Sequence, residues 1–369
     1  MAADDYRQLS AFLAQDPDNV MLIADTARAA LDAGALDDAA RLVTRHRAIA
    51  GDDAAMTYLG GVIAMARQDW DAADAVFARM IEQGDDAPPV RFNRAWSLAR
   101  SGRRADALPL LDEAVVTTIP QGAQLLVGLL HERGDMAAAE AVARAAIERF
   151  PDHRGLNADV STLAVDIEDL ALARATAARA GTHPAALATL GILALDEDRP
   201  EAAAALFADA LARDPGNARA HIGSGLVALA SEDRTGAATA LDRGAASFAT
   251  HTGSWIAAGW AHVLAGDRDA ARDRFDRAMA IDDRFAEAHG SLAVLDLLAG
   301  DVEGGRRRAA VAQRLDRQSF SGALAAAMLA TGAGDTAASE RIVSLALKTP
   351  VDASGRTIGQ ALARMGGRG

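Results

Sequence analysis

The chain has 369 residues, of which half are apolar but only 4% aromatic, and its formal net charge is −13 at pH 7. It contains no cysteine, which excludes disulfides, thiolate metal sites and a cysteine nucleophile in this sequence. The acidic balance disfavours nucleic acid and anionic membranes as partners, because both attract basic surfaces. A composition rich in alanine and poor in aromatics favours closely packed helices, so we expect an all-α protein.

The first ten residues, MAADDYRQLS, are acidic and lack the apolar run of a signal peptide. No stretch of the sequence reaches the length of an apolar transmembrane span, so we expect a cytoplasmic protein. Residues 6–15 place Leu9, Phe12 and Leu13 on one helical face. This spacing predicts a capping helix within residues 1–19.

Residues 20–183 carry five successive patterns of two amphipathic helices joined by a short polar turn. These patterns start at Val20, Ala54, Pro88, Pro120 and Arg154. In the third pattern, the apolar spacing predicts a second helix with Ala107, Leu111 and Ala114 in the core. The fifth pattern is the weakest and the shortest, so we interpret residues 181–183 as a joint between two runs of units.

The unit from Pro184 to Asn217 shows the pattern most clearly. Its first helix carries Leu187, Leu190 and Gly191, and its second helix carries Ala203, Phe207 and Ala210, before Pro215 ends the unit. Small residues at this spacing let two antiparallel helices approach, and large residues fill the space between them. Later units start at Ala218, Thr252, Ala286 and Phe320, each 34 residues after the one before.

This arrangement resembles the tetratricopeptide repeat, which has Leu-Gly at positions 7 and 8, alanine at 20 and 27, an aromatic at 24 and proline at 32. The resemblance covers nearly all of the chain: five units in residues 20–183, five in 184–353, and a capping helix and tail in 354–369 that carry Ile358, Leu362 and Met365. It implies a right-handed α-α superhelix that is held together by packing between neighbouring units and needs no cofactor or metal.

A search for catalytic or metal-binding patterns among the histidines predicts none. His221, His262 and His289 fall at positions 4, 11 and 4 of their units, which face the interior of a helix pair, as does Trp255 at position 4. His131 beside Glu132 has the groups for acid–base work, but we interpret the two as a solvated pair.

Two further segments call for a structural interpretation. Residues 331–336, TGAGDT, have the glycines of a phosphate loop but no lysine, and the repeat places them in a turn between helices. Arg306, Arg307 and Arg308, with Arg314 and Arg317, are expected on an exposed outer helix face, with contact to an acidic partner as the alternative. We therefore expect no catalytic site and a protein that is not an enzyme.

The resemblance implies that the first helices of all units line a concave groove with positions 2, 5, 9, 12 and 13. In the second half of the chain, positions 9 and 12 form an apolar stripe of Ile192, Leu195, Leu226, Leu229, Trp260, Val263, Val294, Leu297 and Met328. In the first half the groove is more polar, and its candidate partner-binding residues are Tyr58, Phe92, Asn93, Trp96, Arg100 and His131. The alternative is that a tight superhelix closes on itself and buries the apolar stripe.

These patterns favour a non-catalytic scaffold or adaptor that binds a protein or peptide segment in its groove. The lysine and asparagine clamp by which some members of the family hold a terminal carboxylate is absent. Two alternatives remain open at this point: a non-catalytic subunit of an enzyme or assembly complex, and a structural protein that forms homo-oligomers. Neither nucleic acid nor a membrane is an expected partner.

Overall fold

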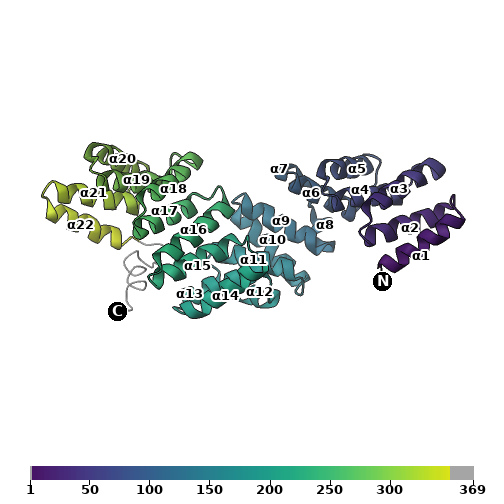
Figure 1. Cartoon of the computed structure of the whole chain (residues 1–369), viewed down its shortest axis with the longest axis horizontal. Coiled ribbons are helices and arrows are strands. Elements are labelled where there is room, and N and C mark those ends of the chain that lie inside the picture. The colour runs from purple at the N-terminus through teal and green to yellow at the C-terminus, as the bar shows by residue number, and fades with distance from the viewer. Residues whose placement is uncertain (1, 350–369) are drawn as a thin grey trace. The chain divides into compact units, whose positions relative to one another are not determined.

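The computed structural model describes residues 2–349, and every regular element in that range is helical. Helices follow one another in antiparallel pairs along the chain (Figure 1). The predicted all-α class is thus confirmed. The predicted capping helix and tail at 354–369 lie outside the described residues.

The chain divides into two compact units, residues 1–163 and 164–369, which we call unit 1 and unit 2. Unit 1 contains α1 (Ala2–Gln15), α2 (Val20–Asp32), α3 (Leu36–Ala50), α4 (Ala54–Ala66), α5 (Trp70–Glu82), α6 (Pro88–Arg100), α7 (Arg104–Ala107), the 3-10 helix η1 (Leu108–Leu110), α8 (Glu113–Thr118), α9 (Pro120–Glu132), α10 (Met136–Arg149) and most of α11 (Arg154–Asp166). The predicted division of the repeats at residue 183 follows repeat length and stays a prediction.

Unit 2 continues the same alternation of first and second helices in its described part. It contains α12 (Leu170–Ala180), α13 (Pro184–Asp196), α14 (Pro200–Arg213), α15 (Ala218–Ala230), α16 (Arg234–Phe248), α17 (Thr252–Ala265), α18 (Arg268–Ile281), α19 (Ala286–Leu298), α20 (Val302–Leu315), α21 (Phe320–Gly332) and α22 (Thr336–Leu347). In both units, the first helix of every pair begins at the residue that the repeat pattern predicts, from Val20 to Phe320.

The second helix of the third pair differs from the prediction, because it is broken into α7, η1 and α8. Pro109 lies in the break, where it has no N–H to donate and its ring clashes with a helical backbone. Asp112 then starts α8 by accepting a hydrogen bond from the Val115 backbone N–H at 3.1 Å. As a result Val115 is fully buried and Ala114 is exposed, so the predicted core position of Ala114 is wrong by one residue.

The contact between position 8 and position 24 explains why the best-matching units pair glycine with phenylalanine. The Phe207 ring is fully buried, and a Cβ added to Gly191 would lie 2.5 Å from it. The same relation holds for Gly61 with Phe77 at 2.6 Å and for Gly259 with Phe275 at 2.2 Å. These glycines therefore make room for an aromatic ring between the helices, in addition to allowing the two backbones to approach.

Candidate functional site

The first-helix face of unit 1 carries a cluster of half-buried aromatic side chains. The Asn93 side-chain N–H donates to the Tyr58 hydroxyl at 2.9 Å, and Tyr58 packs edge-on against Phe77 with ring centroids 5.8 Å apart. Phe92 and Trp96 lie on the same helix, α6, with centroids 6.0 Å apart. Packing and hydrogen bonding thus hold this cluster in fixed orientations, while Tyr58, Phe92 and Trp96 remain partly exposed.

The next first helix, α9, has an open position at Gly128, where a Cβ would meet no heavy atom within 4 Å. Gly128 stands at position 9 of its pair, as Trp96 does in the pair before it. Two other predicted residues of this face are more peripheral: Arg100 is exposed and stacks over the Trp70 ring at 5.5 Å, and His131 is half-buried. Gly128 therefore leaves an open place on the first-helix face at the repeat position that Trp96 fills in the preceding pair.

The predicted apolar stripe of unit 2 is partly covered. Leu226 is exposed and Val294 is buried, and the members that are half-buried are Ile192, Leu195, Leu229, Trp260, Val263, Leu297 and Met328. Val294 therefore packs inside the helix stack and offers little surface. Apart from the exposed Leu226, the remaining members are only partly exposed, so the stripe is neither wholly buried nor wholly open to solvent.

The two tryptophans of α17 have different environments. Trp255 is buried, donates its indole N–H to the Ala249 carbonyl at 2.9 Å and has Arg277 over its ring, as its predicted interior position requires. Trp260 is half-buried and donates to the Ser291 hydroxyl at 3.1 Å. Since Trp260 also packs edge-on against Phe275, it contributes to the packing of the stack.

Sequence reasoning missed three exposed apolar residues at the turn edge of unit 2. Leu264 is 52% exposed, Leu298 is 38% exposed, and Val302 is 48% exposed. Leu264 and Leu298 occupy position 13 of their pairs. That position belongs to the groove set of the family, so extending the stripe from positions 9 and 12 to position 13 would have found them.

Three histidines of unit 2 contact a carbonyl or carboxylate oxygen. His221 is buried with its Nε2 2.9 Å from the Pro215 carbonyl oxygen, and His289 makes the same kind of contact to Asp283 at 2.8 Å. His262 lies 3.0 Å from the Asp242 carboxylate. Among residues 2–349, no three histidine, aspartate or glutamate side chains gather in a way that could hold a metal ion.

Asp242 is the centre of an ionic contact that joins three helices, α16, α17 and α18. Arg274 donates to both of its carboxylate oxygens, at 2.8 and 2.7 Å, and His262 approaches from the other side. Burial alone raises the pKa of Asp242, but the hydrogen bonds from Arg274 and His262 outweigh it and hold the pKa below its ordinary value. The pKa of Arg274 is raised in turn, chiefly by its hydrogen bonds to Asp242.

Asp242→Asn is expected to lower the free energy of unfolding by about 1–2 kcal/mol at pH 7, after allowance for partial solvent exposure. Because the folded-state pKa is depressed, the stabilisation is complete above the unfolded pKa of about 4 and disappears as pH falls through the folded pKa. The difference between wild type and variant should therefore shrink below about pH 4. Urea unfolding across this pH range measures it, with Asp209→Asn, on an exposed carboxylate of α14, as the control. An equal loss for both variants would contradict the expectation.

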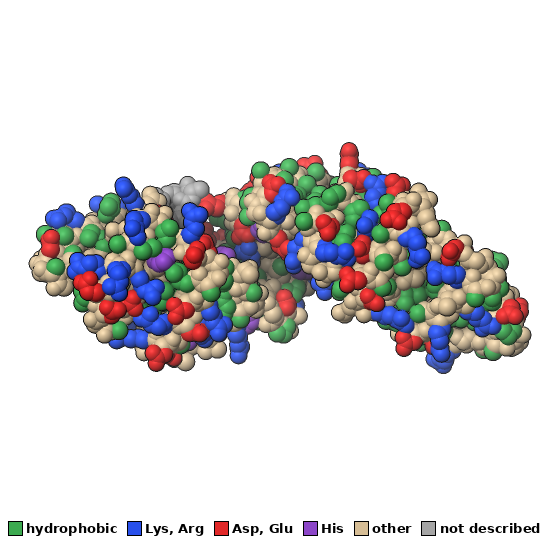
Figure 2. All heavy atoms as spheres, turned by 90° about the horizontal axis from the view of Figure 1, so that it is seen from above, with side chains coloured by type: hydrophobic (Ala, Val, Ile, Leu, Met, Phe, Trp, Pro, Cys, Tyr) green, Lys and Arg blue, Asp and Glu red, His purple; other side chains and the backbone are tan. Residues whose placement is uncertain are grey.

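The arginine-rich segment of α20 lies mainly on the surface, as predicted. Arg306, Arg307, Arg314 and Arg317 are exposed, whereas Arg308 is half-buried and donates to Asp296 at 3.0 Å. Acidic and basic side chains are interspersed over the face of the molecule seen in Figure 2. The TGAGDT segment forms the turn between α21 and α22, as the repeat predicts.

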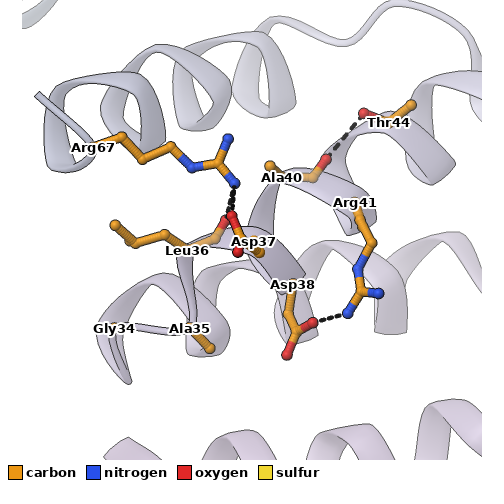
Figure 3. Close-up of a pocket in the computed structure, with 9 residues that line it drawn as sticks. All are labelled: Gly34, Ala35, Leu36, Asp37, Asp38, Ala40, Arg41, Thr44 and Arg67. Carbon is orange, nitrogen blue, oxygen red and sulfur yellow. Dashed lines mark hydrogen bonds and ion pairs between the residues drawn. The ribbon is translucent and has the colours of Figure 1, made fainter. Parts of the chain in front are cut away.

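The hollow at the first pair of unit 1 does not have the features of a ligand site. It has a volume of about 910 Å³ and is lined by residues of the α2–α3 turn, by α3 and by Arg67 (Figure 3). Arg67 donates to Asp37 and to the Leu36 carbonyl, and Asp38 is paired with Arg41. Each charged side chain that lines this hollow is therefore already bound to a neighbour.

Sequence profiles and fold comparisons agree with this architecture. A tetratricopeptide repeat profile matches residues 194–254, and a second such profile matches residues 58–123 and 92–154. The chain belongs to the tetratricopeptide repeat superfamily. Proteins built from this repeat are generally non-catalytic scaffolds for protein interactions.

Solved structures share the tetratricopeptide repeat fold at low sequence identity. The Cut9–Hcn1 hetero-tetramer of APC/C matches with a TM-score of 0.53 and 13% identity, over 96% of this chain and 86% of that one. A monomeric mutant of IFIT1 with Gppp-AAAA matches with a TM-score of 0.53 and 10% identity, over 89% of this chain and 90% of that one. A search of curated protein sequences finds no significant match.

None of the tetratricopeptide repeat helices between residues 2 and 349 combines the length and apolar character that crossing a bilayer requires.

Proposed function

We propose that this tetratricopeptide repeat protein is a non-catalytic scaffold that binds a segment of another protein on the first-helix faces of its pairs. The observation that carries the proposal is the fixed and partly exposed aromatic cluster of unit 1, followed on the next first helix by an open glycine, Gly128, at the same repeat position as Trp96. Partly exposed aromatic rings are typical anchors of protein interfaces, and an open glycine position leaves room for a side chain of the partner.

The stripe of unit 2 supports the same function with a different chemistry. Its half-buried leucine, valine and isoleucine side chains suit an apolar helix face, whereas Asn93 and Tyr58 in unit 1 offer polar groups. The two surfaces therefore fit two different segments, from one partner or from two.

Gly128→Gln is expected to lower affinity for a unit 1 partner by about tenfold or more, because the added side chain occupies space that the proposal assigns to the partner. Folding should be preserved, since the new Cβ meets no atom within 4 Å and glutamine favours a helix. Tagged wild type and variant are compared by quantitative mass spectrometry of proteins captured from the source organism. Gly332→Gln, at an equally open position at the end of α21, is the matched control.

The proposal predicts a set of proteins that is captured by wild type and by Gly332→Gln but lost with Gly128→Gln. Capture of the same proteins by wild type, Gly128→Gln and Gly332→Gln would refute a partner site at Gly128. Light scattering of the purified chain tests the homo-oligomer alternative directly, because a mass that is a multiple of 38.2 kDa would indicate self-association.

A further inference from the structure

The turn edge of unit 2 carries a compact group of exposed apolar side chains, which we call the α17–α20 edge: Leu264, Leu298 and Val302. Leu264 lies near the end of α17, Leu298 ends α19 and Val302 begins α20. The Arg268 guanidinium donates to the Leu298 carbonyl at 3.1 Å, which places the α17–α18 turn against the end of α19. The three exposed side chains thus belong to two turns that this hydrogen bond connects.

Carboxylates border the α17–α20 edge. Asp267, Asp269, Asp301 and Glu303 lie in or beside its two turns, and Arg268 is the one cationic residue in the segments 264–269 and 298–303. That arginine is already bound to the Leu298 carbonyl. Glu303 and Arg306 are 3.7 Å apart and both exposed, so their pairing is weak.

Nearby arginines do not neutralise this border. Arg272 and Arg308 both donate to the buried carboxylate of Asp296, at 2.7 and 3.0 Å. Asp296 therefore holds these two guanidinium groups, which keeps them from pairing with Asp269 and Glu303. An exposed apolar group with an acidic border is the result.

The backbone at this edge favours one kind of partner over another. Asp267 accepts from the Ala270 N–H and Asp301 from the Gly304 N–H, so these carboxylates cap the starts of α18 and α20. With these amides capped and the Leu298 carbonyl bound to Arg268, the edge has little main-chain hydrogen bonding to offer an extended peptide. A helix satisfies its own backbone and needs only side-chain contacts.

We propose that the α17–α20 edge docks an amphipathic helix that carries lysine or arginine on both sides of its apolar stripe. The leucines and Val302 contact the stripe, and the bordering carboxylates attract the flanking cations. This proposal rests on the proposed function as a protein-binding scaffold. It concerns a surface of unit 2, whereas Gly128 belongs to unit 1.

The test uses synthetic helical peptides with leucines at i, i+3, i+4 and i+7 and with lysine, glutamine or glutamate at the flanking positions. Fluorescence anisotropy with the full chain should show the lysine peptide binding about tenfold or more tightly than the glutamate peptide at low salt. The preference should fall several-fold at an ionic strength of about 0.5 M, because screening removes the attraction. A lysine peptide with serine in place of leucine should bind about tenfold more weakly than its leucine parent.

Variants of the protein locate the binding. Leu264→Asn should weaken all the leucine peptides, whereas the pair Asp269→Asn and Glu303→Gln should weaken the lysine peptide alone, by about threefold or more. The controls are Leu345→Asn, at a leucine of α22 that is 72% exposed, and the pair Glu82→Gln and Glu148→Gln on unit 1. Both control variants should bind like wild type.

Three results would overturn the proposal. Equal affinity for the lysine and glutamate peptides would mean that the acidic border selects nothing. Equal effects of the control variants would place binding elsewhere, and an absence of binding by every peptide would mean that the edge is not a helix-docking site. Each of these results leaves the capture experiment at Gly128 to decide the proposed function by itself.

Discussion

Replacing Phe207 by alanine is expected to lower the free energy of unfolding by about 3–5 kcal/mol. The ring is fully buried between two pairs, where it occupies the space left by Gly191 on its own first helix and by Gly223 on the next. A Cβ on Gly223 would lie 2.1 Å from the ring, so the ring and the two glycines form one packed unit. Removing the ring leaves a cavity that these neighbours cannot fill without moving two helices.

The loss should be local, because a repeat protein is stabilised mainly by contacts between adjacent pairs. Denaturant unfolding followed by circular dichroism should therefore show a lower midpoint and a broader or split transition. Leu206→Ala, at the neighbouring half-buried position on the same helix, is the control and should cost less. A single sharp transition with an unchanged midpoint would mean that the ring does not join the two pairs.

The start of every pair could be predicted from the sequence, because the relevant signals are local. Proline occupies the first turn of α6, α9 and α13 and marks the start of each helix. The small residue that recurs at position 20 marks the contact between a helix and its immediate neighbour. The break in the third pair could have been predicted from Pro109. The burial of Val115 in place of Ala114 could not have been predicted, because it depends on the residue at which the helix starts again after the break.

The functional surface was less predictable, because exposure depends on how neighbouring pairs pack. Val294 and Leu226 occupy the same repeat position, yet one is buried and the other exposed. Val294 is buried because Gly290 lets α21 pack closely over α19, which brings Ala325 of α21 into one core cluster with Val294. Repeat position therefore gives the direction of a side chain, and only the spacing between pairs decides whether a partner can reach it.

Gly290→Ala is expected to cost about 3 kcal/mol or more, at or above the upper end of the range for overpacking. A Cβ at this position would lie 2.3 Å from the Gly322 backbone nitrogen and 2.6 Å from the Ser321 carbonyl carbon. Backbone atoms cannot rotate away as a flexible side chain can, so α21 would have to move as a whole.

Moving α21 would also break the polar contacts that hold it against α19. The Glu287 carboxylate accepts from the Phe320 and Ser321 backbone N–H groups at 2.7 and 3.0 Å, which satisfies the start of α21. The Ser291 hydroxyl donates to the Ser321 hydroxyl at 3.1 Å. Steric clash and loss of these contacts therefore act in the same direction.

Hydrogen exchange followed by mass spectrometry should detect the effect as faster exchange in α21 and α22 of Gly290→Ala, with little change in unit 1. Gly332→Ala is the matched control, since it adds the same methyl group to α21 where no atom lies within 4 Å and should leave exchange unchanged. Protection equal to wild type in Gly290→Ala would show that α19 and α21 can separate at little cost. The close approach of α21 to α19 would then result from packing elsewhere in unit 2, and Gly290 would not be required for it.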